Sequence, residues 1–114
     1  MKASTSIHRL FVVFVLWISV SVGEDGRRSI RIVNHAGVKI EVYWVEPSSR
    51  EGFLLTTPNA GMHPGLEIPF DSFVGHEFEI REMPAANTGE CANESNVCNS
   101  ATFIVSETEN ECKL

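Results

Sequence analysis

The stretch PFDSFVGHEFEIRE, residues Pro69–Glu82, carries the clearest structural signal in this chain of 114 residues. After Gly75, apolar and charged residues alternate, and this period of two predicts a β-strand with one buried face. His76 and Phe78 share that face, and a turn at Gly75 would bring the hydroxyl of Ser72 beside the imidazole. We therefore expect a hydroxyl, an imidazole and an aromatic ring to converge on one small site.

The remainder of the chain repeats this pattern in shorter pieces. Runs rich in Val, Ile and aromatic residues are separated by turns that contain Gly, Pro and Asn, and no helical stripe follows the N-terminal segment. This pattern is typical of an all-β fold, and we expect one small β-sandwich over residues 29–106. The expected strands are Ser29–Asn34, Val38–Val45, Phe53–Thr56, Leu66–Phe70, His76–Met83 and Ala101–Ser106.

The expected strand Val38–Val45 shows how the two faces divide. Ile40, Val42 and Trp44 share one face, which belongs in the core, and Tyr43 lies on the opposite, solvated face. Trp44 comes near the end of this strand, where one edge of its ring could line a pocket.

Residues 1–23 have the features of a secretory signal peptide. Lys2 and Arg9 precede the apolar run Leu10–Val20, and Ser21–Gly23 places small residues at both positions that a signal peptidase inspects. We expect cleavage after Gly23 and a protein that is secreted or resides in the secretory-pathway lumen. An uncleaved membrane anchor is the alternative, but the apolar run is shorter than the roughly 20 residues that span a bilayer.

Charge and length limit the function classes of the mature chain. Without Lys2 and Arg9, seven basic residues face fifteen acidic ones, a net charge of −8. This charge repels nucleic acid and anionic membrane surfaces, so neither is an expected partner. Residues 24–28 form a short linker, and 107–114 form an acidic tail without room for another full strand. The tail either ends a minimal sandwich with an exposed edge or marks a truncated chain.

The expected bonding of the three cysteines follows from the oxidising compartment that a signal peptide implies. Cys91 and Cys98 are expected to form a disulfide across a polar loop, which leaves Cys112 without a partner in the chain. Zinc binding is the competing interpretation, but this spacing without a histidine pair suits zinc poorly. The tripeptide Asn93-Glu94-Ser95 inside the loop is a candidate glycosylation site at Asn93.

The strand that ends near Trp44, followed by Ser72-Phe73-Val74-Gly75-His76-Glu77-Phe78, resembles the β-domain family of the von Hippel–Lindau tumour suppressor. The resemblance covers roughly Ile30 to Val105 and implies a β-sandwich of that type. The family's fold closes with a further strand, and its helical domain has no counterpart in this sequence.

The resemblance implies a peptide-binding module that recognises hydroxyproline. Ser72 and His76 would hydrogen-bond the added hydroxyl, and Trp44 and Phe78 would pack on the pyrrolidine ring. The family has tryptophan where this chain has Phe78, and it uses a tyrosine that is missing between Trp44 and Ser72. A structural or accessory β-domain without a ligand, or a fragment of a larger prolyl-hydroxylase-type oxygenase, are the alternative functions.

Catalysis is not expected. No nucleophile elbow surrounds Ser72, and Asp71 is adjacent to it rather than placed to orient His76. Iron- and 2-oxoglutarate-dependent chemistry needs two histidines and a carboxylate, yet no His-x-Asp or His-x-Glu occurs. We expect no catalytic residue, no cofactor and no metal. Trp44 and Phe78 could also be plain core, His76 a structural histidine, and Ser72 a turn cap.

Overall fold

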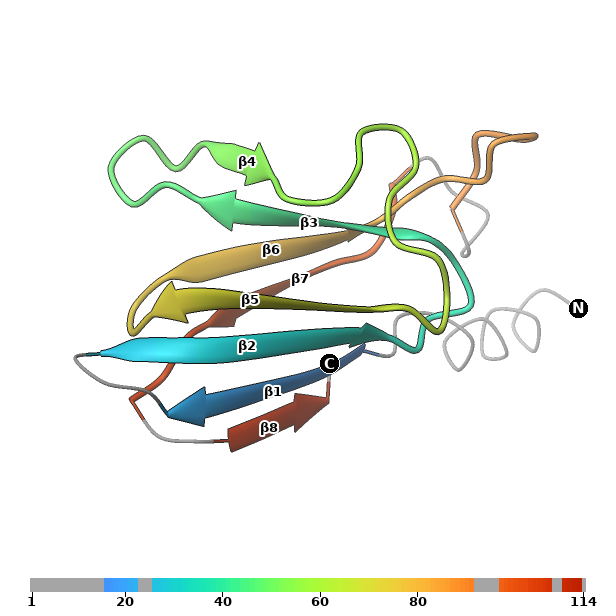
Figure 1. Cartoon of the computed structure of the whole chain (residues 1–114). Helices are drawn as coiled ribbons and strands as arrows, with labels where there is room; N and C mark the ends of the chain where they lie inside the picture. Colours follow the sequence, from blue (N-terminus) through green and yellow to red (C-terminus); the bar gives the residue numbers. More distant parts are fainter. Residues whose placement is uncertain (1–15, 23–25, 92–96, 108–109, 114) are drawn as a thin grey trace, which may run out of the picture.

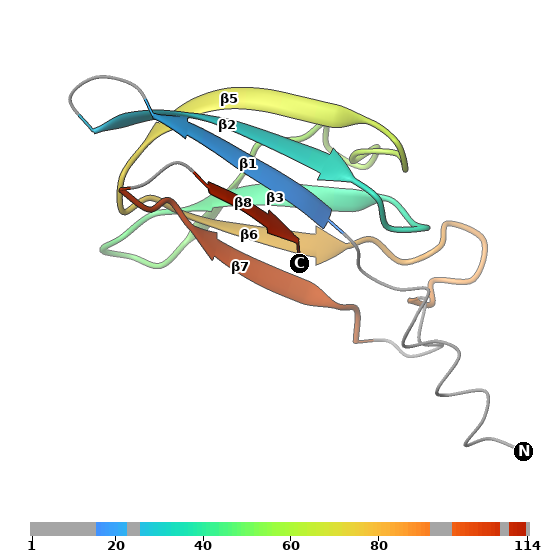
Figure 2. The same ribbon diagram turned by 90° about the horizontal axis from the view of Figure 1, so that it is seen from below.

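The computed structural model describes residues 16–22, 26–91, 97–107 and 110–113. Their strands form two antiparallel four-stranded sheets packed face to face (Figures 1 and 2). Sheet A has the order β5-β2-β1-β8, with β1 Leu16–Val22, β2 Arg27–Asn34, β5 Glu67–Phe73 and β8 Asn110–Lys113. Sheet B has the order β4-β3-β6-β7, with β3 Ile40–Val45, β4 Gly52–Leu54, β6 Glu77–Glu82 and β7 Ser100–Ile104.

The expectation of an all-β fold is confirmed, since the described residues form strands and no helix. None of them belongs to a helix long and apolar enough to cross a membrane. All six expected strands are present as β2 to β7. The main difference is β5, which runs on to Phe73 because its ladder with β2 continues through the pairs Arg28–Ser72 and Arg27–Phe73. Ser72 therefore lies within a strand and not in a turn.

The core lies between the two sheets and follows the expected alternation. In β3, Ile40 and Val42 are fully buried, and Trp44 packs against the same cluster while remaining partly exposed. Both sheets contribute to this cluster, whose main aliphatic and aromatic members are Leu16, Ile18, Val20, Ile30, Ile32, Ile40, Val42, Phe78, Ile80, Phe103 and Val105.

Strand β1 was not expected, because it lies inside the segment with the features of a signal peptide. It pairs with β2 along its whole length and with β8 on its other side. The side chains of Leu16, Ile18 and Val20 are buried in the core. Cleavage after Gly23 would therefore remove an inner strand of sheet A together with three core side chains.

The expectation that no further strand follows Ala101–Ser106 is wrong. The short strand β8, Asn110–Lys113, lies within the expected acidic tail and adds to sheet A beside β1. The sequence of β8 gave no strand signal because its residues are polar. Its pairing with β1 comes from backbone hydrogen bonds and not from an apolar face.

A buried asparagine ties the two sheets together at one end of the sandwich. The side chain of Asn34 is fully buried, and its Nδ2 donates hydrogen bonds to the carbonyls of Val38 (3.0 Å) and Met62 (2.8 Å). Its Oδ1 accepts a hydrogen bond from the backbone N–H of Ala36 at 2.8 Å. Met62 in turn exchanges two backbone hydrogen bonds with Ile40. One side chain therefore links the end of β2, the turn into β3 and the connection from β4 to β5.

The substitution Asn34→Ala should lower the free energy of unfolding by about 2–4 kcal/mol, because each buried polar group left without a partner costs about 1–3 kcal/mol. Urea denaturation measures the change. His35→Ala is the matched control, because His35 is the exposed neighbour of Asn34. Its substitution should change the free energy of unfolding by no more than about 0.5 kcal/mol. Equal stability of the two variants would show that the Asn34 hydrogen bonds do not hold the sheets.

Candidate functional site

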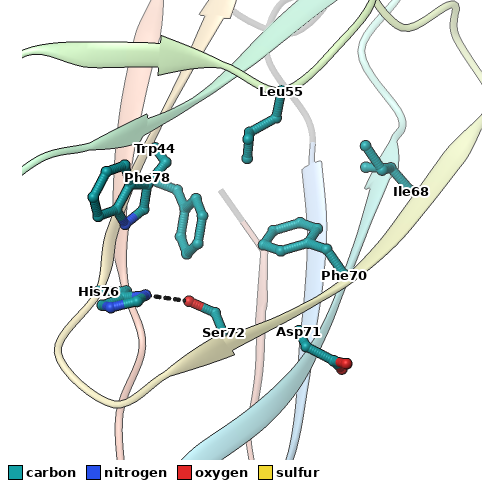
Figure 3. A pocket seen from close by; sticks show the side chains of 8 residues that line it. All are labelled: Trp44, Leu55, Ile68, Phe70, Asp71, Ser72, His76 and Phe78. Atoms are coloured by element: carbon teal, nitrogen blue, oxygen red, sulfur yellow. Dashed lines mark hydrogen bonds between the residues drawn. The ribbon is translucent and has the colours of Figure 1, made fainter.

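The four residues expected at a ligand site, Trp44, Ser72, His76 and Phe78, line one cavity of about 370 Å³ (Figure 3). It lies between the two sheets, with β5, the edge strand of sheet A, on one side and sheet B on the other. The remaining lining residues are Leu55, Ile68, Phe70 and Asp71.

Sheet B supplies the aromatic part of the cavity. Trp44 of β3 and Phe78 of β6 are direct cross-strand partners, so their rings emerge side by side on the face that looks toward sheet A. Phe78 is 2% exposed and belongs to the core, whereas Trp44 is partly exposed. Phe70 of β5 meets Phe78 edge to face, with ring centroids 4.9 Å apart. This contact closes the cavity from the side of sheet A.

The turn between β5 and β6 aims His76 back at β5. The N–H of His76 donates to the carbonyl of Phe73 at 3.1 Å, and Gly75 has a φ of +92°. A four-residue turn with positive φ at its third position favours glycine there. The turn is also anchored to the segment after β7, because the Gly75 N–H donates to the Val105 carbonyl and the Val105 N–H donates to the His76 carbonyl, both at 2.9 Å.

The hydroxyl and the imidazole form the polar part of the cavity. Ser72 Oγ and His76 Nδ1 are 2.7 Å apart and hydrogen-bonded, and Ser72 is only 3% exposed. When Oγ–H is the donor, the serine oxygen keeps lone pairs for a further donor. When Nδ1–H is the donor, the serine proton is available instead. Each tautomer leaves the pair able to bind one more polar group.

Two aromatic rings fix the orientation of the imidazole. Trp44 and Phe73 each approach the His76 ring at a centroid distance of 5.7 Å, with interplanar angles of 64° and 65°. Edge-to-face contacts of this kind are favourable beyond the area that they bury. Phe53 lies 5.8 Å from Trp44 and is, like Phe73, an exposed aromatic residue near the cavity.

The indole of Trp44 carries an unused donor. Its Nε1 is buried and has no hydrogen-bond partner among the described residues. A buried donor without an acceptor costs about 1–3 kcal/mol. Because the nitrogen itself is buried, a ligand acceptor in the cavity satisfies it only when a neighbouring side chain moves aside.

Asp71 is also a lining residue, but its carboxylate points away from His76 (Figure 3). Its Oδ1 accepts a hydrogen bond from Ser29 Oγ at 3.4 Å on the exposed face of sheet A. The Ser72–His76 pair thus lacks, among the lining residues, a carboxylate that orients the imidazole for nucleophilic catalysis. The arrangement is suited to holding a hydroxyl or another small polar group.

Sequence reasoning did not assign four of the lining residues to the ligand site, namely Leu55, Ile68, Phe70 and Asp71. Ile68 and Phe70 could have been found, because they precede Ser72 at a spacing of two in β5 and therefore share its face. Leu55 follows β4, and its position depends on how β4 pairs with β3, which no local pattern reveals.

Ion pairs hold the β3–β4 turn against β6. Arg50 binds Glu77 through two hydrogen bonds of 2.8 and 2.9 Å, and this contact lowers the pKa of Glu77. In the same turn, the backbone N–H of Ser49 and then the hydroxyl of Ser48 lower the pKa of Glu46 to about 2. The turn connects the strand of Trp44 to the strand of Phe53.

The expected disulfide between Cys91 and Cys98 is present. A carboxylate oxygen of Glu82 lies within 4.8 Å of both sulfurs, so these three residues are a conceivable metal-ligand group, but the disulfide engages both sulfurs. The predicted glycosylation site at Asn93 and the side chain of Cys112 lie outside the described residues.

No protein-family model matches this chain, and no curated protein or solved structure is significantly similar to it.

The pKa of Glu46 gives a test of the turn beside the site. Because its folded value of about 2 lies below the ordinary value of 4.5, the ionised carboxylate favours the folded state above pH 4.5. That contribution is lost as the pH falls toward 2. In an NMR titration of the side-chain carboxyl carbon, we expect a midpoint near 2 and a higher midpoint in Ser48→Ala. A midpoint near 4.5 in the unmodified protein would contradict the turn geometry.

Proposed function

We propose that this chain is a non-catalytic β-domain of the von Hippel–Lindau type that binds a peptide through a hydroxyproline side chain. The observation that carries the proposal is the Ser72–His76 hydrogen bond of 2.7 Å at a cavity lined mainly by aromatic and aliphatic side chains. A hydroxyproline presents the same combination, a flat apolar ring with one hydroxyl. The ligand is therefore a peptide whose hydroxyproline enters this cavity.

The hydroxyl of the ligand would complete the hydrogen bonding of the polar pair. A hydroxyl both donates and accepts, so it suits the pair in either tautomer of His76. An unmodified proline would cover the Ser72–His76 pair without offering a partner for the remaining hydrogen-bonding capacity of Ser72. The hydrogen-bonding capacity that the Ser72–His76 bond leaves unused is then desolvated without a partner, which costs up to about 1–3 kcal/mol and is the expected source of discrimination.

The ring of the ligand would pack between the two sheets. Trp44 and Phe78 form the aromatic side of the cavity and Phe70 faces them from β5. The cavity volume of about 370 Å³ lies at the lower end of the range of roughly 300–1,000 Å³ that is usual for small-ligand pockets. One prolyl ring with its flanking backbone is an appropriate occupant.

Two residues of this chain differ from those of the family, and these differences indicate which hydrogen-bonding group the ligand would provide. Phe78 offers no N–H, and Tyr43, the only tyrosine, lies on the outer face of sheet B with its hydroxyl donating to Glu41 at 2.8 Å. The unpaired Nε1 of Trp44 is the donor that remains. We infer that a ligand acceptor beside Trp44 takes the place of the contact that the family makes through its tyrosine.

The disulfide between Cys91 and Cys98 supports an oxidising compartment and so favours the secretory pathway. With the signal-peptide features of residues 1–23, it leads us to propose a secreted or luminal protein. Its ligand would then be an extracellular or luminal polypeptide that carries hydroxylated proline.

The proposal is tested by isothermal titration of the folded chain with three matched peptides that contain proline, trans-4-hydroxyproline or cis-4-hydroxyproline. One hydroxyproline epimer should bind about 5- to 100-fold more tightly than proline, which corresponds to about 1–3 kcal/mol. The other epimer, whose hydroxyl lies on the opposite ring face, should bind like proline. Equal or undetectable binding of all three peptides would exclude this function.

Two substitutions test whether the preference for hydroxyproline arises at Ser72 and His76. His76→Ala and Ser72→Ala should each remove most of the discrimination between hydroxyproline and proline while the protein stays folded. Ser29→Ala is the matched control, because it makes the same chemical change on the exposed face of the neighbouring strand β2. A hydroxyproline preference that survives in both cavity variants would move the binding site elsewhere.

A further inference from the structure

The inner strand of sheet A coincides with the segment that a signal peptidase would remove. Residues 1–23 have signal-peptide features, and β1, Leu16–Val22, lies within them while pairing with β2 on one side and β8 on the other. A chain cleaved after Gly23 keeps both neighbours of β1 but loses the strand between them. The result is a vacant strand position beside β2, which we call the strand slot, and β8, whose ladder partner is β1, loses its pairing as well.

The strand slot is apolar on its inner side. With β1 in place, its residues Leu16, Ile18 and Val20 cover the core, and Ile30 and Ile32 of β2 are buried beside them. Without β1, one edge of β2 would lose the backbone partners of the whole ladder from Arg28 to Asn34. Unpaired strand edges and exposed apolar core are both unfavourable in water and favour the addition of a new strand.

Strand β8 cannot fill the slot itself. It is antiparallel to β1, which is antiparallel to β2, so β8 runs parallel to β2. It has four residues where β1 has seven, and its sequence Asn-Glu-Cys-Lys contains no aliphatic side chain to replace those of β1. A shift of β8 onto β2 would leave the core uncovered.

We propose that the cleaved protein completes sheet A with an extended strand donated by another polypeptide. This inference rests on the secretion proposed above together with cleavage after Gly23, but it concerns a surface separate from the cavity at Ser72 and His76. The donated strand runs antiparallel to β2 and takes the place of β1. The main chain of β2 provides hydrogen bonds, and the core beneath selects the side chains.

The register of β1 defines the chemistry of the donor. Its inward positions face the core opposite Asn34, Ile32 and Ile30, so the donor has aliphatic residues at three alternating positions. Its outward position at Ser19 lies opposite Arg31, which is exposed and bonded on its other side to Glu67 at 3.1 Å. The same position lies opposite Glu111 in the ladder with β8, so a cation and an anion flank it on either side, and a small uncharged polar residue such as the serine of β1 suits it.

The test uses the full chain with a protease site inserted at residues 23–25, between β1 and β2. The folded protein is cleaved, unfolded in urea with its disulfide intact, and refolded by dilution with an excess of a labelled peptide. The matched peptide has the sequence of β1, LWISVSV. In the control peptide, LWSISVV, residue 18 is exchanged with residue 19, and residue 20 with residue 21. Both serines then lie on the inward face. Fluorescence polarisation and size-exclusion chromatography measure retention.

The matched peptide should bind saturably and at least about tenfold more tightly than the exchanged peptide, since burial of each aliphatic side chain is worth about a factor of ten or more. Failure of the matched peptide to bind, or equal binding of the matched and exchanged peptides, would overturn the strand slot.

Mass spectrometry of the chain recovered from the secretory pathway provides the second readout. We expect an N-terminus at Glu24, and a chain that still carries residues 16–22 would overturn the proposal, because the slot would never be vacant. Titration of the refolded sample with the hydroxyproline peptide separates the two proposals. Binding of the β1 peptide without a hydroxyproline preference counts against the cavity proposal alone. A hydroxyproline preference without binding of the β1 peptide counts against the strand slot alone.

Discussion

The fully buried side chain of Asn34 holds together the parts of the fold on which the cavity depends. Its three hydrogen bonds to backbone groups join the β2–β3 turn to the segment around Met62, and thereby set the distance between sheet A and sheet B at one end. Beyond Met62 the chain continues into β5, which carries Ser72. A polar residue can occupy the core here because both polar atoms of its side chain are hydrogen-bonded.

The cavity combines a polar pair with apolar walls, and the pair tolerates this environment because its members satisfy each other. A serine buried alone among aromatic rings would lose its hydration without compensation, whereas Ser72 bonds to His76 at 2.7 Å. The free protein therefore carries little penalty for keeping these groups beside Trp44 and Phe78. An aspartate in the same place would need a cationic partner, and Asp71 accordingly points to the opposite face of β5, where it meets Ser29.

Local alternation predicted the strands from β2 to β7, most clearly β2 and β6, whose buried residues recur at every second position. It failed for β1, where only Ser19 and Ser21 interrupt the apolar residues and the segment reads as the end of a signal peptide. It failed for β8 because that strand has no apolar face. At the cavity, the residues of the Trp44 and His76 strands could be predicted, while Leu55 could not, since its position depends on pairing between distant segments.

The turn that presents His76 is bonded through Gly75 to Val105, a residue that follows the last strand of sheet B. The imidazole is thus held in place by a part of the chain that leaves the ribosome long after the histidine itself. Contacts between residues so distant in sequence form late, because the entropy of closing the intervening loop must be overcome first. A nascent chain that ends before Val105 lacks this anchor, so the hydrogen bonds that hold the His76 turn can form only after β7 has been synthesised.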